Sequence, residues 1–181
     1  MRKIILACSI VLAMFAAPAF PQDEELLKGV RLYREEKFQD AADVLQMVVE
    51  KEPENDIAWT YLGGSLENLG KHRKARIALK KKGKDKDSPL KYEKELQITG
   101  TQKAKYTDDA ALQMGLQGNV VLAVEFKADG TIGFIVVLHD LSPGLTKSAI
   151  KATRAITFRP AVADGKPVPV IRPVSYDFLI R

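Results

Sequence analysis

The hydrophobic pattern of the chain changes its period about half-way along. After an apolar N-terminal segment, the apolar residues up to about residue 82 follow helical spacing, whereas beyond residue 91 they mostly alternate with polar residues over short segments. Helical spacing predicts amphipathic helices, and alternation predicts half-buried strands. The pattern therefore predicts an α+β protein, in which helical hairpins precede a small domain with two helices packed on an antiparallel sheet.

The second half, residues 91–181, is expected to form one such domain. Val120, Leu122, Val124 and Phe126 share one face of a strand, and Glu125 lies on the other face. Asp129-Gly130 is typical of a hairpin turn. The strands are expected at 96–99, 119–126, 132–138, 156–158 and 168–180, and the helices at 107–114 and 145–156.

Prolines break the last extended segment. Pro167, Pro169 and Pro173 each lack the backbone N–H that a sheet ladder needs. The first half of this segment is therefore expected at a sheet edge or outside the sheet.

The first twenty residues have the organisation of a secretory signal peptide. Arg2 and Lys3 precede an apolar run over 4–15, and Ala17-Pro18-Ala19 is a small-residue cleavage motif. The run is shorter than the ~20 residues of a spanning helix. Cleavage would place the mature chain in the periplasm and remove Cys8, the only cysteine. The alternative is an uncleaved anchor that leaves the protein at the inner membrane, facing the periplasm.

A 34-residue repeat covers residues 22–87, with repeats at about 22–55 and 56–89. Four pairs match at this offset, namely Gly29 with Gly63, Leu32 with Leu66, Ala41 with Ala75 and Leu45 with Leu79. The period and residue types resemble the tetratricopeptide (TPR) repeat, a helix-turn-helix unit. A generic segment of four helices is the alternative.

The repeat residues predict a groove and close helix contacts. Trp59, Leu62 and Leu66 share one helical face and are expected to fill the groove, while the small residues Gly63, Ala41 and Ala75 allow neighbouring helices to approach. Two repeats are fewer than the ~3 that stabilise such arrays. The pair is therefore expected to pack on the following domain or on another chain.

The net charge of +5 is unevenly distributed. Residues 23–56 contain eleven acidic and five basic residues, whereas residues 71–94 contain eleven basic and three acidic ones. The basic run lacks the interleaved aromatic residues that stack on bases, so nucleic acid is not an expected partner. A solvated face, or attraction to the acidic first repeat of another copy, explains it better.

No catalytic motif is found. The chain lacks HExxH and GxSxG, and its two histidines, His72 and His139, are far apart and fit a solvated turn and a strand end. The sequence therefore predicts no enzyme, metal site or cofactor.

Local signatures in the second half resemble the C-terminal domain of the TonB family of energy transducers. Tyr106 precedes a short helix, Gly118 opens a strand, and Asp129-Gly130 forms the hairpin turn. Phe158-Arg159-Pro160-Ala161 is then followed by a turn at Gly165. The resemblance covers about eighty residues, in the order of elements typical of the family.

This resemblance implies a site for an extended peptide. In the family, a segment of an outer-membrane transporter adds as a strand to the sheet, and unpaired backbone groups supply the affinity. The receiving strand maps here onto Ala155, Ile156, Thr157, Phe158 and Arg159. Phe158 and Arg159 are candidate selectors, although Ile156 and Phe158 can instead simply close the core.

Three functions remain open from the sequence. The first is a periplasmic protein that binds an outer-membrane transporter or another envelope protein by strand addition. The second is an inner-membrane-anchored transducer that energises outer-membrane transport. The third is a structural homo-oligomer held by the incomplete repeats.

Overall fold

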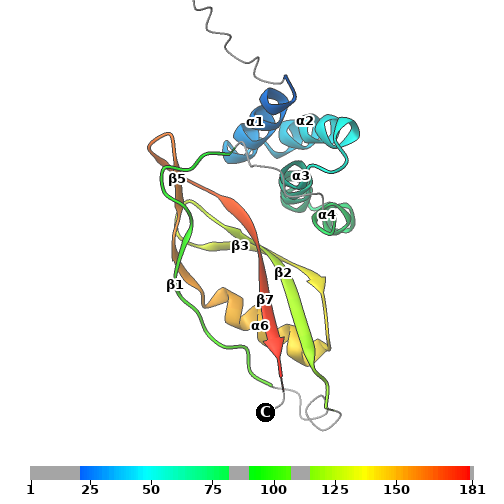
Figure 1. The fold of residues 1–181 in the computed structure, drawn as a ribbon, viewed down its shortest axis with the longest axis vertical. Helices are drawn as coiled ribbons and strands as arrows, with labels where there is room; N and C mark the ends of the chain where they lie inside the picture. Colours follow the sequence, from blue (N-terminus) through cyan, green and yellow to red (C-terminus); the bar gives the residue numbers. More distant parts are fainter. Residues whose placement is uncertain (1–20, 82–89, 107–114, 180–181) are drawn as a thin grey trace, which may run out of the picture.

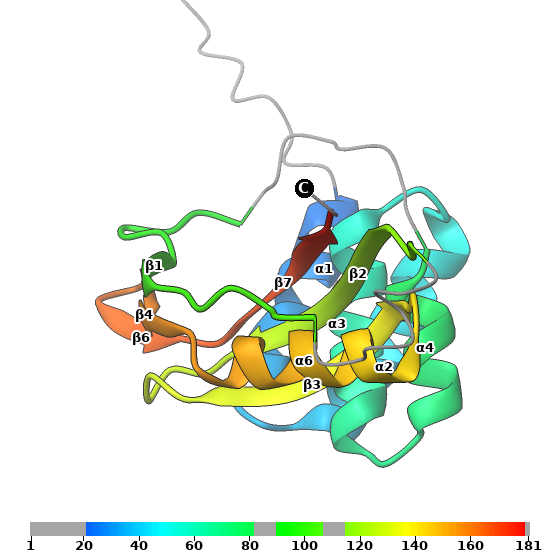
Figure 2. The ribbon, with the colours of Figure 1, turned by 90° about the horizontal axis from the view of Figure 1, so that it is seen from below.

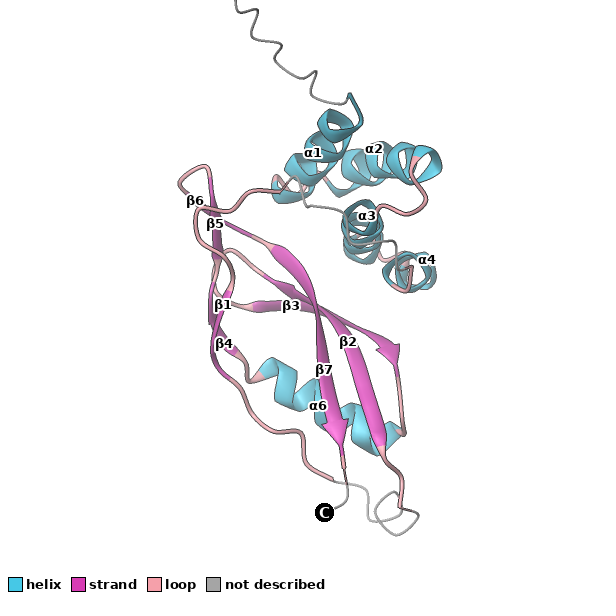
Figure 3. Cartoon of the chain, viewed as in Figure 1, coloured by secondary structure: helices cyan, strands magenta, loops and turns pink. Residues whose placement is uncertain are grey.

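The computed structural model describes residues 21–81, 90–106 and 115–179 (Figure 1). The expected signal segment, the linker at 82–89 and the expected helix at 107–114 lie outside the described residues. The described parts form the predicted α+β architecture, with helices first and antiparallel strands after them (Figure 3).

Over residues 21–81, four helices form two hairpins. They are α1 (Pro21–Arg34), α2 (Phe38–Lys51), α3 (Asp56–Asn68) and α4 (His72–Leu79). Gly70 has φ +71°, the left-handed conformation expected at the turn between α3 and α4. The assignment of the hairpins to the TPR family stays a prediction.

The described strands of the second half form three small antiparallel sheets. Their strand orders are β3-β2-β7, β1-β4 and β5-β6. The strands are β1 (Gln97–Gly100), β2 (Gly118–Phe126), β3 (Ile132–His139), β4 (Thr157–Arg159), β5 (Ala161–Ala163), β6 (Lys166–Val168) and β7 (Val170–Phe178).

Helix α6 (Pro143–Arg154) covers one face of the three-stranded sheet. Its N-cap is Ser142, whose Oγ accepts a hydrogen bond from the N–H of Leu145 at 3.2 Å. The apolar residues of α6 and of one face of β2 share a core. Figures 1 and 2 show the helical hairpins on the opposite face, so the sheet lies between two helical layers.

The region after α6 differs in detail from its expected form. The expected turn at Asp164 and Gly165 is present, with both residues at positive φ, but it joins two short strands that were not expected, β5 and β6. The long strand β7 begins only at Val170 and pairs with β2 over nine residues. The prolines account for this division, because they disfavour a continuous ladder.

Glu125 is the clearest departure from the sequence pattern. The residue lies on the polar face of β2, as expected, yet its exposed fraction is only 4%. Helix α1 covers this face, and its Tyr33 donates a hydrogen bond to Glu125 Oε1 at 2.5 Å. The alternation of polar and apolar residues in β2 cannot show that its polar face is buried by a helix from a distant part of the chain.

Among the described helices, none combines the length and apolar character that crossing a membrane requires.

Candidate protein-interaction surfaces

The predicted receiving strand has a neighbour from its own chain. Strand β4 pairs antiparallel with β1, with Gln97 opposite Arg159 and Ile98 opposite Phe158. Upstream of β1, the N–H groups of Glu93 and Val162 each bond a carbonyl of the other segment, with Glu93 N donating to Val162 O at 2.8 Å. The side of β4 that faces β1 is therefore not free for a guest strand.

The apolar residues of this segment are part of the core. Ile156 is 7% exposed, and its N–H donates to the carbonyl of Thr153 at 3.1 Å. Phe158 packs edge-on against Phe126 with ring centroids 4.9 Å apart. Thr157 and Arg159 are exposed, while Ala155 lies in the turn after α6. The structure thus brings Ile156 and Phe158 to the core and leaves Thr157 and Arg159 at the surface.

Strand β7 presents a second sheet edge. In the described part of the chain, β7 pairs with β2 along one side and with no strand along its other side. Ser175 and Asp177, in its C-terminal half, have exposed side chains. Ile171, near its start, is buried in the core of the helical hairpins. The helices therefore cover the first part of β7 and leave the last part accessible.

Pro173 indicates how the backbone of β7 is oriented. The residue pairs with Ala123 in the middle of the ladder, where a proline is accommodated if its N–H position faces away from the neighbouring strand. Backbone groups alternate in direction along an antiparallel strand. Ser175 and Asp177 are in phase with Pro173, so their N–H groups point to the open side.

The family-motif residues have structural roles. Tyr106 Oη donates to the carbonyl of Leu116 at 3.1 Å, and its ring contacts Phe178 edge-on at 5.4 Å. Gly118 and Gly130 have positive φ, and Asp129 Oδ1 accepts the N–H of Thr131 at 2.9 Å. Gly165 also has positive φ and donates its N–H to Glu93, while Pro160 separates β4 from β5.

An aromatic and polar cluster joins the helical hairpins to the sheet. Tyr33 stacks edge-on with Tyr61 at 5.2 Å, and the hydroxyl oxygens of Tyr61 and Tyr92 are 3.3 Å apart. Burial, followed by the charge of Glu125 and the hydrogen bond to it, raises the pKa of Tyr33. Burial and the neighbouring Tyr92 raise the pKa of Tyr61. Both hydroxyls therefore stay protonated well above neutral pH.

Gly64 allows a helix and the sheet to approach closely at this boundary. A Cβ placed at Gly64 would lie 2.3 Å from Ile171 Cδ1 and 3.1 Å from the ring of Tyr33. Only a glycine fits between these side chains without a shift of the helix or the sheet.

A groove lies on the helical hairpins, between α2 and α4, with a volume of about 390 Å³. Trp59, Leu62 and Leu66 of α3 line it. The small residues of the repeats lie at contacts between helices: Ala41 and Ala75 are fully buried, and Gly63 faces Leu79, whose Cγ would be 2.5 Å from a Cβ at this glycine. The small residues thus serve helix packing.

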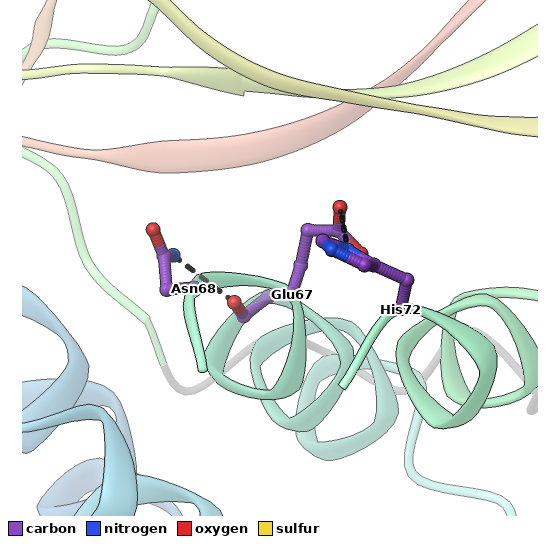
Figure 4. Close-up of polar contacts among 4 residues, drawn as sticks. Glu67, Asn68 and His72 are labelled. Atoms are coloured by element: carbon purple, nitrogen blue, oxygen red, sulfur yellow. Dashed lines mark hydrogen bonds and ion pairs between the residues drawn. The ribbon is translucent and has the colours of Figure 1, made fainter. Parts of the chain in front are cut away.

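The turn between α3 and α4 carries a polar cluster (Figure 4). His72 Nδ1 lies 2.8 Å from Glu67 Oε1, and Asn68 Nδ2 donates to the carbonyl of Gly64 at 3.0 Å. His72 is strongly exposed, which agrees with a solvated turn residue. Within the described ranges, no group of three or more His, Cys, Asp or Glu side chains is arranged to hold a metal ion.

The comparison with protein families identifies the second half of the chain. Residues 102–179 match the family model described as Gram-negative bacterial TonB protein C-terminal. These residues form a TonB C-terminal domain. The TonB C-terminal domain contains β2, β3, α6 and β4 to β7, and with them both edges described above. It gives the protein a TonB-like interaction role in the cell envelope, and members of this family are energy transducers rather than enzymes.

Among solved structures, the solution NMR structure of the Pseudomonas aeruginosa TonB CTD is similar to this chain. The two share 24% sequence identity, with a TM-score of 0.41, over 48% of this chain and 87% of the other. No similar protein was found among curated proteins.

Proposed function

We propose that this protein binds an extended segment of an outer-membrane transporter, or of another envelope protein, in the periplasm. The segment adds as a strand to the TonB C-terminal domain, and the protein acts as an adaptor. The observation that carries the proposal is the side of β7 that no other described strand occupies, an edge of the three-stranded sheet. Unpaired backbone groups on such an edge bind a guest strand with little dependence on its side chains.

Pro173 limits the part of β7 that can bond to a guest strand. The open side lacks an N–H at Pro173, whereas Ser175 and Asp177 retain theirs. The accessible surface of β7 lies in the same C-terminal part, beyond the cover of the helices. The guest strand is therefore expected to pair beside Val174–Phe178.

Strand β4 is the second candidate edge, because the resemblance to the family maps the receiving strand there. A guest strand on its paired side would have to displace β1. That pairing is short, with a register shift between Ile98 and Gly100, and the side chain of Ile98 is 42% exposed.

Two proline variants distinguish the edges. Ser175→Pro removes an N–H from the open side of β7 and should weaken transporter recovery by about tenfold, since one hydrogen bond contributes ~1 kcal/mol and the guest strand must also shift. Ser175→Ala keeps the N–H and should bind normally. The measurement is co-purification with outer-membrane transporters, after crosslinking in cells that naturally make the protein.

Thr157→Pro is the matching variant for β4. Loss of partners in Thr157→Pro, with normal recovery in Ser175→Pro, would assign the site to β4. Normal recovery in both variants, when circular dichroism shows them folded, would contradict strand addition at either edge.

A further inference from the structure

The groove on the helical hairpins has walls of opposite charge. The exposed surface of α2 carries Asp40, Asp43 and Glu50, and contains no basic residue before Lys51. The exposed surface of α4 and its flanks is basic, and no acidic residue occurs between 69 and 81. Its exposed basic side chains are Lys71, Arg73, Lys74, Arg76, Lys80 and Lys81.

Each wall also presents one large apolar side chain to solvent. Met47 on α2 is 47% exposed, and Ile77 on α4 is 55% exposed. Between them, the floor of the groove is apolar, with Leu62 and Leu66 from α3. An acidic ridge, an apolar floor and a basic ridge therefore lie in this order across one face.

Contacts within the chain use little of this charge. Lys71 Nζ donates to Gln39 Oε1 at 3.2 Å, and Gln39 Nε2 donates to Asp43 Oδ1 at 2.8 Å, which links the two walls through a neutral amide. Lys81 lies over the ring of Trp59 at 5.5 Å. No direct ion pair joins α2 to α4 within the described ranges.

We propose that this face binds the same face of a second copy of the chain, related by a two-fold axis along the groove. A two-fold contact needs a self-complementary surface, in which residue i meets j and j meets i. An axis along the groove places the acidic α2 of each copy against the basic α4 of the other, and brings Met47 near Ile77. An axis across the groove would instead oppose like charges, so the charge pattern selects the first arrangement.

The residues that line the groove belong to α2, α3, α4 and the turn before α4, and none of them belongs to a strand. The proposed contact therefore uses residues other than those of the β7 and β4 edges. This inference is independent of strand addition, and either can fail without the other.

Charge reversal tests the proposal on the purified full chain. Asp43→Lys opposes lysine to lysine at both symmetry-related contacts, and Lys74→Glu opposes acid to acid. Sedimentation equilibrium in 0.1 M salt should show a dimer for the unchanged protein and a dissociation constant about tenfold or more higher for each variant. In 1 M salt the unchanged protein should also dissociate more readily, because the charges are exposed.

Mixing the two variants provides the decisive control. Asp43→Lys and Lys74→Glu, combined in equal amounts, restore opposite charges at both contacts, so the mixture should dimerise more tightly than either variant alone. The double variant D43K/K74E should dimerise by itself for the same reason. A monomer of the unchanged protein at 100 μM would overturn the proposal, and so would a dimer insensitive to both reversals. A protein that stays monomeric yet binds an acidic peptide in the groove would assign the face to a different partner.

Discussion

Tyr33 and Glu125 place a polar contact inside the boundary between the helices and the sheet. A buried carboxylate is tolerated there because a hydroxyl donates to it, and the hydroxyl in turn needs an acceptor. The hydrogen bond between them therefore offsets the desolvation cost of burying both groups, although the two residues are 92 positions apart in the sequence.

Removal of the Tyr33 hydroxyl should lower the stability of the fold. Tyr33→Phe keeps the ring but leaves Glu125 Oε1 without its donor, and we expect the free energy of unfolding to fall by about 1–3 kcal/mol. Urea unfolding followed by circular dichroism measures the change. Tyr176→Phe, at a half-buried hydroxyl bonded to Thr153, is the control and should cost less. Equal losses in the two variants would contradict a special role for the Tyr33 contact.

The same tyrosine predicts a dependence on alkaline pH. Tyrosine in the unfolded chain ionises near pH 10, whereas burial and Glu125 raise the pKa of Tyr33 in the fold. Above pH 10 the unfolded chain loses a proton that the folded chain keeps, so stability is complete below pH 10 and falls as the pH rises. The slope should approach about 1.4 kcal/mol per pH unit for each such tyrosine. Urea titrations between pH 9 and 11.5 should show a shallower fall in Tyr33→Phe, and identical slopes would exclude this cause.

Gly64 and Ile171 should be energetically coupled. Gly64→Ala places a methyl group against Ile171 Cδ1, which should cost about 1–3 kcal/mol despite the better helix propensity of alanine. Ile171→Val removes this Cδ1, so the double variant should recover part of the loss. A double-mutant cycle on the free energy of unfolding measures the coupling. Additive effects would show that the helix accommodates the methyl group in another way.

At the scale of elements, the N-termini of the helices are not equally capped. Asn55 Oδ1 accepts the N–H of Ala58 at 2.9 Å at the start of α3, while Lys37 and Lys71 provide no side-chain cap for α2 and α4. Asn55→Ala should therefore destabilise the protein by about 1 kcal/mol. Lys37→Ala should be nearly neutral in the same thermal-unfolding measurement, and a loss equal to that of Asn55→Ala would contradict the capping role.

The elements that the sequence predicted well are those with a local signal. The alternation of Val120, Leu122 and Val124 predicted β2, and the helical spacing after Gly144 predicted α6, which the structure begins at Pro143. The turn at Gly165 was predicted, but the strands β5 and β6 on either side of it were not, because strands of three residues are too short to show alternation.

The candidate sites were harder to predict than the helices and strands, because they depend on contacts between segments that are distant in the sequence. The sequence could group Trp59, Leu62 and Leu66, because one helical face determines their relative position. The pairing of β4 with β1 and the burial of Glu125 could not be read from local patterns, because residues 58 and 92 positions away provide the partners. The oppositely charged walls were visible as charge segregation, but only the fold shows that they flank one groove.

At the scale of the whole molecule, the N-terminus decides between an adaptor and an anchored transducer. We expect the mature chain to begin near Phe20, because Ala17-Pro18-Ala19 fits a cleavage site. Mass spectrometry of the protein from native cells measures this directly. An intact Met1 in the membrane fraction would contradict cleavage and favour the transducer.

Strand β2 contributes side chains to two separate packed regions, one on each face of the sheet. Its even-numbered residues Val120, Leu122 and Val124 belong to the core under α6, while Glu125 faces the helices on the other side. The insertion or deletion of a single residue in β2 would turn each set toward the wrong side, so that a carboxylate enters one core and valines meet Tyr33. A change in the length of β2 therefore requires compensating substitutions both in the core under α6 and at the contact with the helical hairpins, whereas a change in loop length does not.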